Sequence, residues 1–143
     1  VMDGLAAYVR DLDPGACPPA PVQPIRMESV MDDATRAMRA AGAAMAHKDA
    51  PTAILMVASA RTQLGLIHER FSAPALGHER AALRGADLDL ASIQNALRAG
   101  DGGAALRLAL WPGQAAALTR TLQARESKSL FDPAMLAAAV RAR

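Results

Sequence analysis

Apolar residues recur at alternating spacings of three and four along most of this chain, and this repeat constrains the fold more than any other feature. Such spacing places apolar side chains on one face of an α-helix. The repeat is clearest in four segments, which carry Met31, Ala34, Met38, Ala41 and Met45; Ala53, Val57, Ala60, Leu64, Ile67 and Phe71; Leu83, Ala86, Leu90, Ile93 and Leu97; and Trp111, Ala115, Leu118 and Leu122. No segment alternates with a period of two over a useful length. The sequence therefore predicts an all-α fold, an antiparallel helical bundle of four long helices with short flanking helices.

Capping and helix-breaking residues predict the helix boundaries. We expect long helices over residues 29–48, 51–71, 75–99 and 106–122, followed by a short helix that begins at 132–133. Ser29 with Asp32 resembles a capping box, and Asp49 is placed to cap the helix that Pro51 opens. Pro112 is expected to kink or split the helix around it.

The same repeat predicts which side chains are buried. We expect the core to contain Val57, Leu64, Leu83, Leu90, Ile93, Leu97, Leu118 and Leu122. Aromatic residues make up only 3% of the chain, so little surface is left for stacking bases or sugars. Arg61 interrupts the apolar run of its helix. We expect this side chain to be exposed, the alternative being an ion pair with Glu69 or with an Asp of a neighbouring helix.

Prolines divide the chain into an N-terminal segment and a helical domain. The spacing of apolar residues predicts a short amphipathic helix over residues 1–12. Five prolines within residues 13–26 exclude a regular helix there and favour an extended linker. The bundle domain is then expected to occupy residues 27–143.

Charge and composition argue against several classes of function. The 16 Lys and Arg residues nearly balance the 14 Asp and Glu residues and form no cluster, so we expect no nucleic-acid partner. Cys17 is the only cysteine, which excludes a disulfide within the chain. No apolar run approaches the ~20 residues that a membrane span needs, so we expect none.

Motifs of nucleotide binding and of nucleophilic catalysis are absent from the sequence. The run Gly100-Asp101-Gly102-Gly103 has neither a preceding strand nor a phosphate-binding Lys, so we interpret it as the turn that ends a helix. No Ser lies in a nucleophile elbow. We therefore expect a protein without enzymatic activity.

A repeated tripeptide supplies the candidate site residues. The sequence His-Glu-Arg occurs at 68–70 and again at 78–80, at the end of one predicted helix and the start of the next. A helical hairpin would bring both to the same end of the bundle, where two imidazoles and a carboxylate can hold a metal ion or a haem edge. The candidate residues are His68, His78 and Glu69 as ligands, with Glu69 or Glu79 as the acceptor for a ring N–H. The alternative is that each histidine is an ordinary surface residue.

Methionines form a second candidate surface. Met27, Met31, Met38 and Met45 lie along one stripe of a single predicted helix. Thioethers can bind Cu(I), but a methionine stripe at core spacing is more typical of packing or of an adaptable interface. We therefore expect a protein partner, bound by the Met and Ala face together with the hairpin tip around residues 68–80.

Residues 2–12, MDGLAAYVRDL, resemble the closing helix of class I c-type cytochromes, which often has the form D-x-L-x-A-Y-[LV]-R-x-L. Leu5, Tyr8, Val9 and Leu12 occupy the positions that in this family pack on the first helix and the haem. The resemblance implies the C-terminal part of a c-type cytochrome or of a di-haem cytochrome c peroxidase-like protein, with an appended helical domain and a periplasmic location. The chain has no Cys-x-x-Cys-His motif, so haem is expected in an upstream domain and not on this chain.

These observations together predict a non-enzymatic helical interaction or structural module, appended to a periplasmic electron-transfer protein. The first alternative is a haem- or metal-binding four-helix bundle that uses His68, His78 or a Met as ligand. The second alternative is a cytoplasmic regulatory or assembly partner. The oligomeric state does not follow from the sequence.

Overall fold

The computed structural model describes residues 24–142, and helices account for most of them. The α-helices are α2 (Met27–Ala46), α3 (Ala50–Arg70), α4 (Gly77–Arg98), α5 (Gly103–Gln123) and α6 (Pro133–Arg141), and the short 3₁₀ helices are η2 (Pro74–Leu76) and η3 (Glu126–Lys128). No strand occurs in this part of the chain, so the predicted all-α class is confirmed. The predicted helix over residues 1–12, and the linker up to residue 23, lie outside the described residues.

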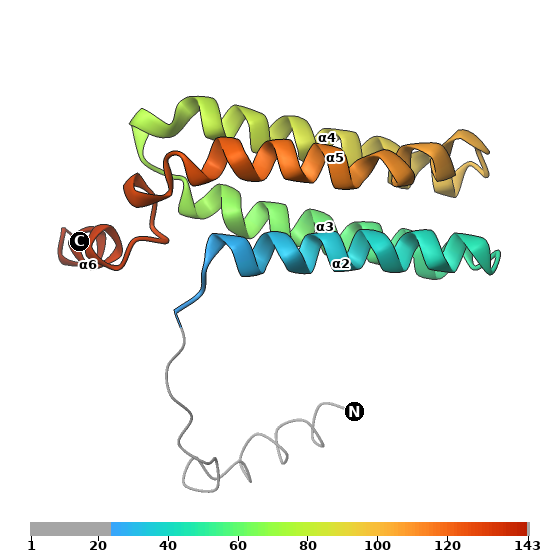
Figure 1. Ribbon diagram of the computed structural model, residues 1–143, viewed down its shortest axis with the longest axis horizontal. Helices are drawn as coiled ribbons and strands as arrows, with labels where there is room; N and C mark the ends of the chain where they lie inside the picture. Colours follow the sequence, from blue (N-terminus) through green and yellow to red (C-terminus); the bar gives the residue numbers. More distant parts are fainter. Residues whose placement is uncertain (1–23, 143) are drawn as a thin grey trace, which may run out of the picture.

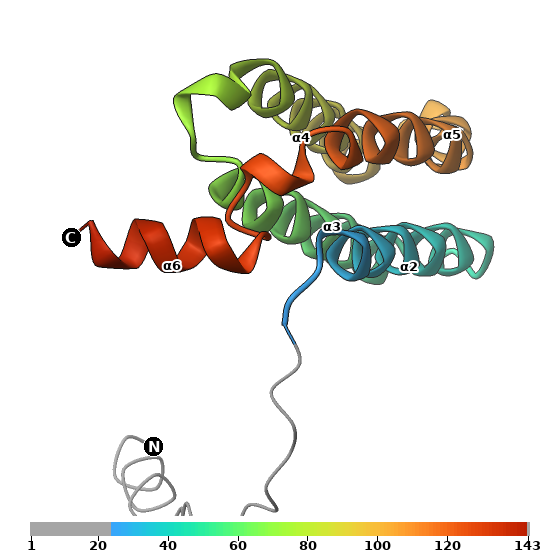
Figure 2. The same ribbon diagram turned by 60° about the vertical axis from the view of Figure 1, so that its left-hand side comes forward.

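The four long helices pack as two antiparallel hairpins (Figures 1 and 2). One hairpin consists of α2 and α3 and the other of α4 and α5, and they stack so that α2 packs against α5 and α3 against α4. This is the predicted antiparallel bundle. α6 projects from the end of the bundle where α2 begins and α3 ends. None of the helices in residues 24–142 is both long enough and apolar enough to cross a membrane.

Local signals explain two of the helix ends. The Asp49 side chain accepts a hydrogen bond from the backbone N–H of Thr52, and Pro51 lies in the first turn of α3, as predicted. α4 ends just before Gly100, whose φ of 70° lies in the left-handed region that a glycine adopts at little cost. Both caps were readable from residue type alone.

Two local predictions are wrong. The Ser29 capping box does not form, because α2 already begins at Met27, and the Ser29 hydroxyl instead donates to the carbonyl group of Arg26. Burial of Met27 extends the helix beyond the predicted start. The prediction that Pro112 splits its helix is wrong, since α5 runs unbroken from Gly103 to Gln123, whereas the alternative of a kink stays a prediction. The burial of Trp111 and of the other core residues of α5 holds the helix together where one backbone hydrogen bond is missing.

The core follows the predicted pattern. All eight residues expected to be buried are buried, and Trp111 and Phe71 are the largest fully buried side chains. Phe71 packs against Phe131 at the end of the bundle, with ring centroids 6.2 Å apart. The core therefore extends beyond the four helices into the segment that leads to α6.

That segment is fastened to the end of α3. The backbone N–H of Leu130 donates to the Arg70 carbonyl oxygen over 2.8 Å, and the Arg70 guanidinium donates to the Leu130 carbonyl oxygen over 3.0 Å. The same guanidinium lies 5.2 Å above the Phe131 ring. α6 thus starts from a fixed base, although none of its own residues is buried.

Candidate functional site

Two grooves lie on opposite faces of the bundle. One lies between α3 and α4 and has a volume of about 520 Å³, and the other lies between α2 and α5 and has a volume of about 330 Å³. The stacking of the two hairpins places α3 and α4 on one side of the molecule and α2 and α5 on the other (Figures 1 and 2). The two grooves differ sharply in their chemistry.

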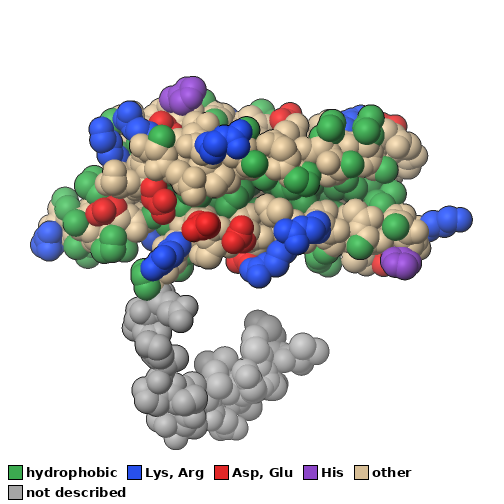
Figure 3. Space-filling model, in the orientation of Figure 1, with side chains coloured by type: hydrophobic (Ala, Val, Ile, Leu, Met, Phe, Trp, Pro, Cys, Tyr) green, Lys and Arg blue, Asp and Glu red, His purple; other side chains and the backbone are tan. Residues whose placement is uncertain are grey.

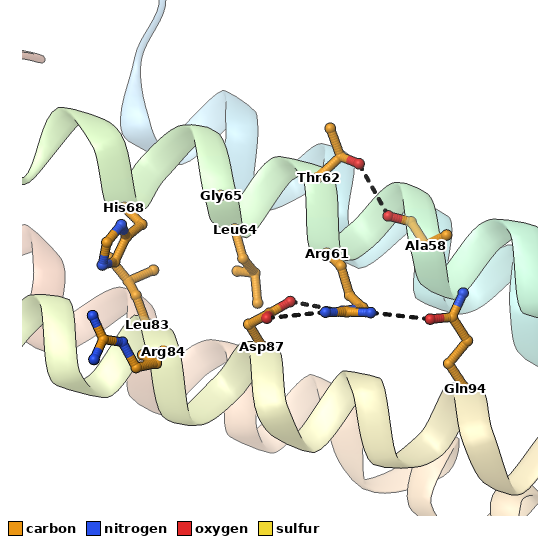
Figure 4. A pocket seen from close by; sticks show the side chains of 10 residues that line it. All are labelled: Ala58, Arg61, Thr62, Leu64, Gly65, His68, Leu83, Arg84, Asp87 and Gln94. Carbon is orange, nitrogen blue, oxygen red and sulfur yellow. Dashed lines mark hydrogen bonds and ion pairs between the residues drawn. The ribbon is translucent and has the colours of Figure 1, made fainter.

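A row of hydrogen-bonded side chains crosses the α3/α4 groove (Figure 4). Arg61 donates to both carboxylate oxygens of Asp87, over 2.7 and 3.1 Å, and to the side-chain oxygen of Gln94 over 3.1 Å. Gln94 in turn donates to the Ile54 carbonyl oxygen over 3.3 Å. The Asp87 carboxylate raises the pKa of Arg61 above its ordinary value. Arg61 is therefore a fixed cation with three of its five N–H donors in use.

The expectation that Arg61 is exposed is wrong. Its side chain is 34% exposed, as is that of Asp87, and the pair is the alternative in which an Asp of a neighbouring helix is the partner. Asp87 and Gln94 are seven residues apart, which places both on the same face of α4. Gln94 was not predicted, although its position within the apolar stripe of α4 is a signal for a buried polar residue.

The other end of the α3/α4 groove is cationic. The Arg80 Nε–H donates to the His68 Nε2 atom over 3.4 Å, and Arg84 lies one turn further along α4, with its guanidinium beside His68 in Figure 4. Burial is the largest cause that lowers the pKa of His68, the charges of Arg80 and Arg84 lower it further, and Glu69 opposes them. His68 is consequently a neutral acceptor at pH 7.

The structure does not bring His78 to His68. The α4 residue that reaches His68 is Arg80, and two helical positions correspond to a rotation of roughly 200°. His78 and Glu69 are exposed, whereas Glu79 is buried and its Oε2 atom has no hydrogen-bond partner. Within residues 24–142 no group of three or more His, Cys, Asp and Glu residues is placed to hold a metal ion. The paired-histidine site stays a prediction.

The α2/α5 groove is apolar. Met38, Met45, Leu108 and Trp111 line it, and Arg39 is the only charged residue of its lining. Figure 3 shows hydrophobic side chains along the seam between these two helices. Met38 is buried in the core, so the methionine stripe contributes to packing as well as to this surface.

Comparison of the sequence with family models and curated proteins, and of the fold with solved structures, gives no match. Function is therefore argued from the surfaces of the chain itself.

Proposed function

We propose that this chain contains a non-enzymatic helical interaction module that pairs with a second copy of itself through α6. The observation that carries the proposal is that α6, nine residues long and largely apolar, has no buried residue. Isolated helices shorter than about 12 residues are marginal in water. One flank of α6 borders a groove beside Ser72 and Ala73, but Leu136 and Val140 stay exposed, so a further covering surface would stabilise the helix.

The start of α6 is fixed by the bundle and by a helix cap. Phe131 is buried against the bundle, and the next residue, Asp132, accepts hydrogen bonds from the backbone N–H groups of Ala134 and Met135. Pro133 occupies the first turn, where its fixed φ suits a helix. The direction of α6 is thus set at its base, and Leu136 and Val140 are exposed to solvent.

The charges of α6 favour a second copy as the occupant. Asp132 caps its start and Arg141 lies in its last turn, and no charged residue stands between them. In an antiparallel pair of α6 helices, Arg141 of each copy would lie beside Asp132 of the other, and the two helix dipoles would oppose each other. Both copies would use the same patch, as a two-fold symmetric interface requires.

Pairing through α6 would bring together the domains that precede the bundle in the two copies. The resemblance of residues 2–12 to a cytochrome helix implies an electron-transfer domain upstream of the bundle. A self-pairing bundle would hold two such domains together, in the periplasm if that resemblance is correct. The module would then act through association alone.

Sedimentation velocity of the 143-residue chain tests the proposal. We expect a dimer for the wild type and a monomer for the double variant Leu136→Glu, Val140→Glu, because two carboxylates would be buried against apolar side chains. The matched control is Leu55→Glu, Leu88→Glu, which changes leucines that are 63% and 62% exposed on α3 and α4. The control is expected to remain a dimer.

Two results would overturn the proposal. The first is a wild type that stays monomeric throughout the micromolar range. The second is a dimer that survives the α6 substitutions but dissociates in the α3/α4 control. Circular dichroism of every variant checks that the bundle remains folded, which we expect because all four substituted side chains lie outside the core.

A further inference from the structure

Positive charge gathers at the end of the α3/α4 groove where Arg84 and His68 line it, because Arg80, which lies outside the lining, donates a hydrogen bond to the same histidine. Three ion pairs occur within residues 24–142, and neither Arg80 nor Arg84 takes part in any of them. Asp87, the one carboxylate of the groove lining, has both oxygens engaged by Arg61, and the carboxylate of Glu69, next to His68 in the sequence, is exposed. The donors of these two arginines are therefore free for a ligand, apart from the Nε–H that Arg80 directs to His68.

The shape of the groove suits a small molecule. Its floor is formed by Leu64 and Leu83, which are almost completely buried, and one wall is left open at Gly65. A Cβ atom added to Gly65 would meet nothing within 4 Å. The missing side chain therefore leaves open space at Gly65, which lies one turn along α3 from His68 (Figure 4).

The remaining polar side chains of the groove are satisfied internally. Arg61, Asp87 and Gln94 bond to one another and to the backbone, so part of their hydrogen-bonding capacity is already engaged. Recognition must then come from the cationic end and from the apolar floor.

We propose that this groove binds a small amphiphilic oxyanion, a phosphate monoester or a carboxylate with a short apolar body. The head group receives hydrogen bonds from Arg80 and Arg84 and lies beside His68, and the body lies over Gly65 and the leucine floor. Paired guanidinium groups suit an oxyanion because their N–H donors match its geometry. The site is independent of α6 and of its pairing.

Backbone amide NMR titrations of the full chain with butyl phosphate, butyrate and inorganic phosphate test the proposal and separate the two head groups. We expect saturable shifts at Gly65, His68 and Arg84. The double variant Arg80→Gln, Arg84→Gln should weaken binding at least about tenfold, since a hydrogen bond to a charged group commonly contributes that much. The charge-matched control Arg98→Gln, Arg120→Gln changes two exposed arginines outside the groove and should bind as the wild type does.

A second variant tests the body of the ligand. Gly65→Leu fills the open space at Gly65 without replacing a charged residue, so it should weaken the binding of butyl phosphate and leave that of inorganic phosphate unchanged. A bound oxyanion should also raise the pKa of the His68 imidazole, which its own NMR titration measures.

Three outcomes would overturn the assignment: no saturable shifts with any probe, equal weakening in the control, or a Gly65→Leu protein that binds butyl phosphate normally.

Discussion

The two grooves of this bundle are built alike but lined differently. Each lies between two antiparallel helices, and each has a helical glycine in its lining, Gly65 on α3 and Gly42 on α2. At neither position would an added Cβ meet another atom within 4 Å. The α3/α4 groove holds a charged row and a cationic end, whereas the α2/α5 groove presents methionine, leucine and tryptophan. The comparison shows that two grooves of similar construction differ in what they can bind, because the side chains around each helical glycine differ.

The largest expected effect is at the floor of the apolar groove. Trp111→Ala should lower the free energy of unfolding by about 3–5 kcal/mol, because it removes the largest buried side chain and leaves a cavity. Urea unfolding followed by circular dichroism measures this loss. The matched change on the other face is Leu83→Ala, expected to cost about 2–5 kcal/mol. A loss below about 0.5 kcal/mol for Trp111→Ala would mean that its side chain is not part of the core.

The hydrogen-bonded row of Arg61, Asp87 and Gln94 should contribute much less than the core to the free energy of unfolding. Asp87→Ala removes the partner of Arg61, and since both side chains are 34% exposed we expect a loss of only about 1 kcal/mol. Asp89→Ala is the control, an exposed carboxylate on the same helix, and should change the free energy of unfolding by less than about 0.5 kcal/mol. If both substitutions lowered the free energy of unfolding equally, the Arg61–Asp87 ion pair would stabilise the protein no more than an exposed carboxylate does.

The fold was predictable because the apolar repeat identifies the buried face of each helix. Leu64 and Leu90 lie at the centre of that face and are buried as expected. The repeat does not say which flank of a helix meets which neighbour. Arg80 and His78 lie on opposite flanks of the α4 stripe, and only the packing of the hairpins decides that Arg80 is the one that faces α3. For the same reason the α3/α4 groove was not predicted.

α6 illustrates a second limit of the sequence. Asp132 and Pro133 predicted where this helix begins, and the structure has the same start. Its apolar residues are compatible with a place in the core. That they remain exposed depends on the direction in which the anchored segment before α6 leaves the bundle, which is a tertiary property.

The two glycines test the shared feature of the grooves. Gly65→Ala and Gly42→Ala should each stabilise the protein by about 0.5–1 kcal/mol, since alanine is the better helix former and the added methyl group meets no other atom within 4 Å. Thermal unfolding of both variants measures the gain. Gly100→Ala is the control of opposite sign, because a φ of 70° is strained for alanine. Destabilisation by either helical substitution would show that the groove is already closed at that glycine.

The smallest expected effect is the pH dependence of stability that His68 causes. It distinguishes the two grooves, because His68 lines the α3/α4 groove alone. Burial and the charges of Arg80 and Arg84 lower the pKa of His68 in the folded protein. Between the folded-state pKa and the unfolded-state value of about 6.5, the unfolded chain binds more protons at this ring, so stability rises with pH in that interval. The contribution of His68 is therefore complete at neutral pH, and it is lost as the pH falls through the folded-state pKa.

Urea midpoints measured from pH 7 down to pH 5 test this sign. The wild type should lose more stability over this range than His68→Gln does, because glutamine has no proton to bind, while the carboxylates that both proteins share contribute equally. Met38→Leu, in the apolar groove, should follow the wild-type profile, since it changes no titratable group. If His68→Gln instead lost as much stability as the wild type, burial and the two arginines would not act on this ring. If the wild type lost less than His68→Gln, a negative charge near His68 would outweigh them, and the groove would not be the cationic one described above.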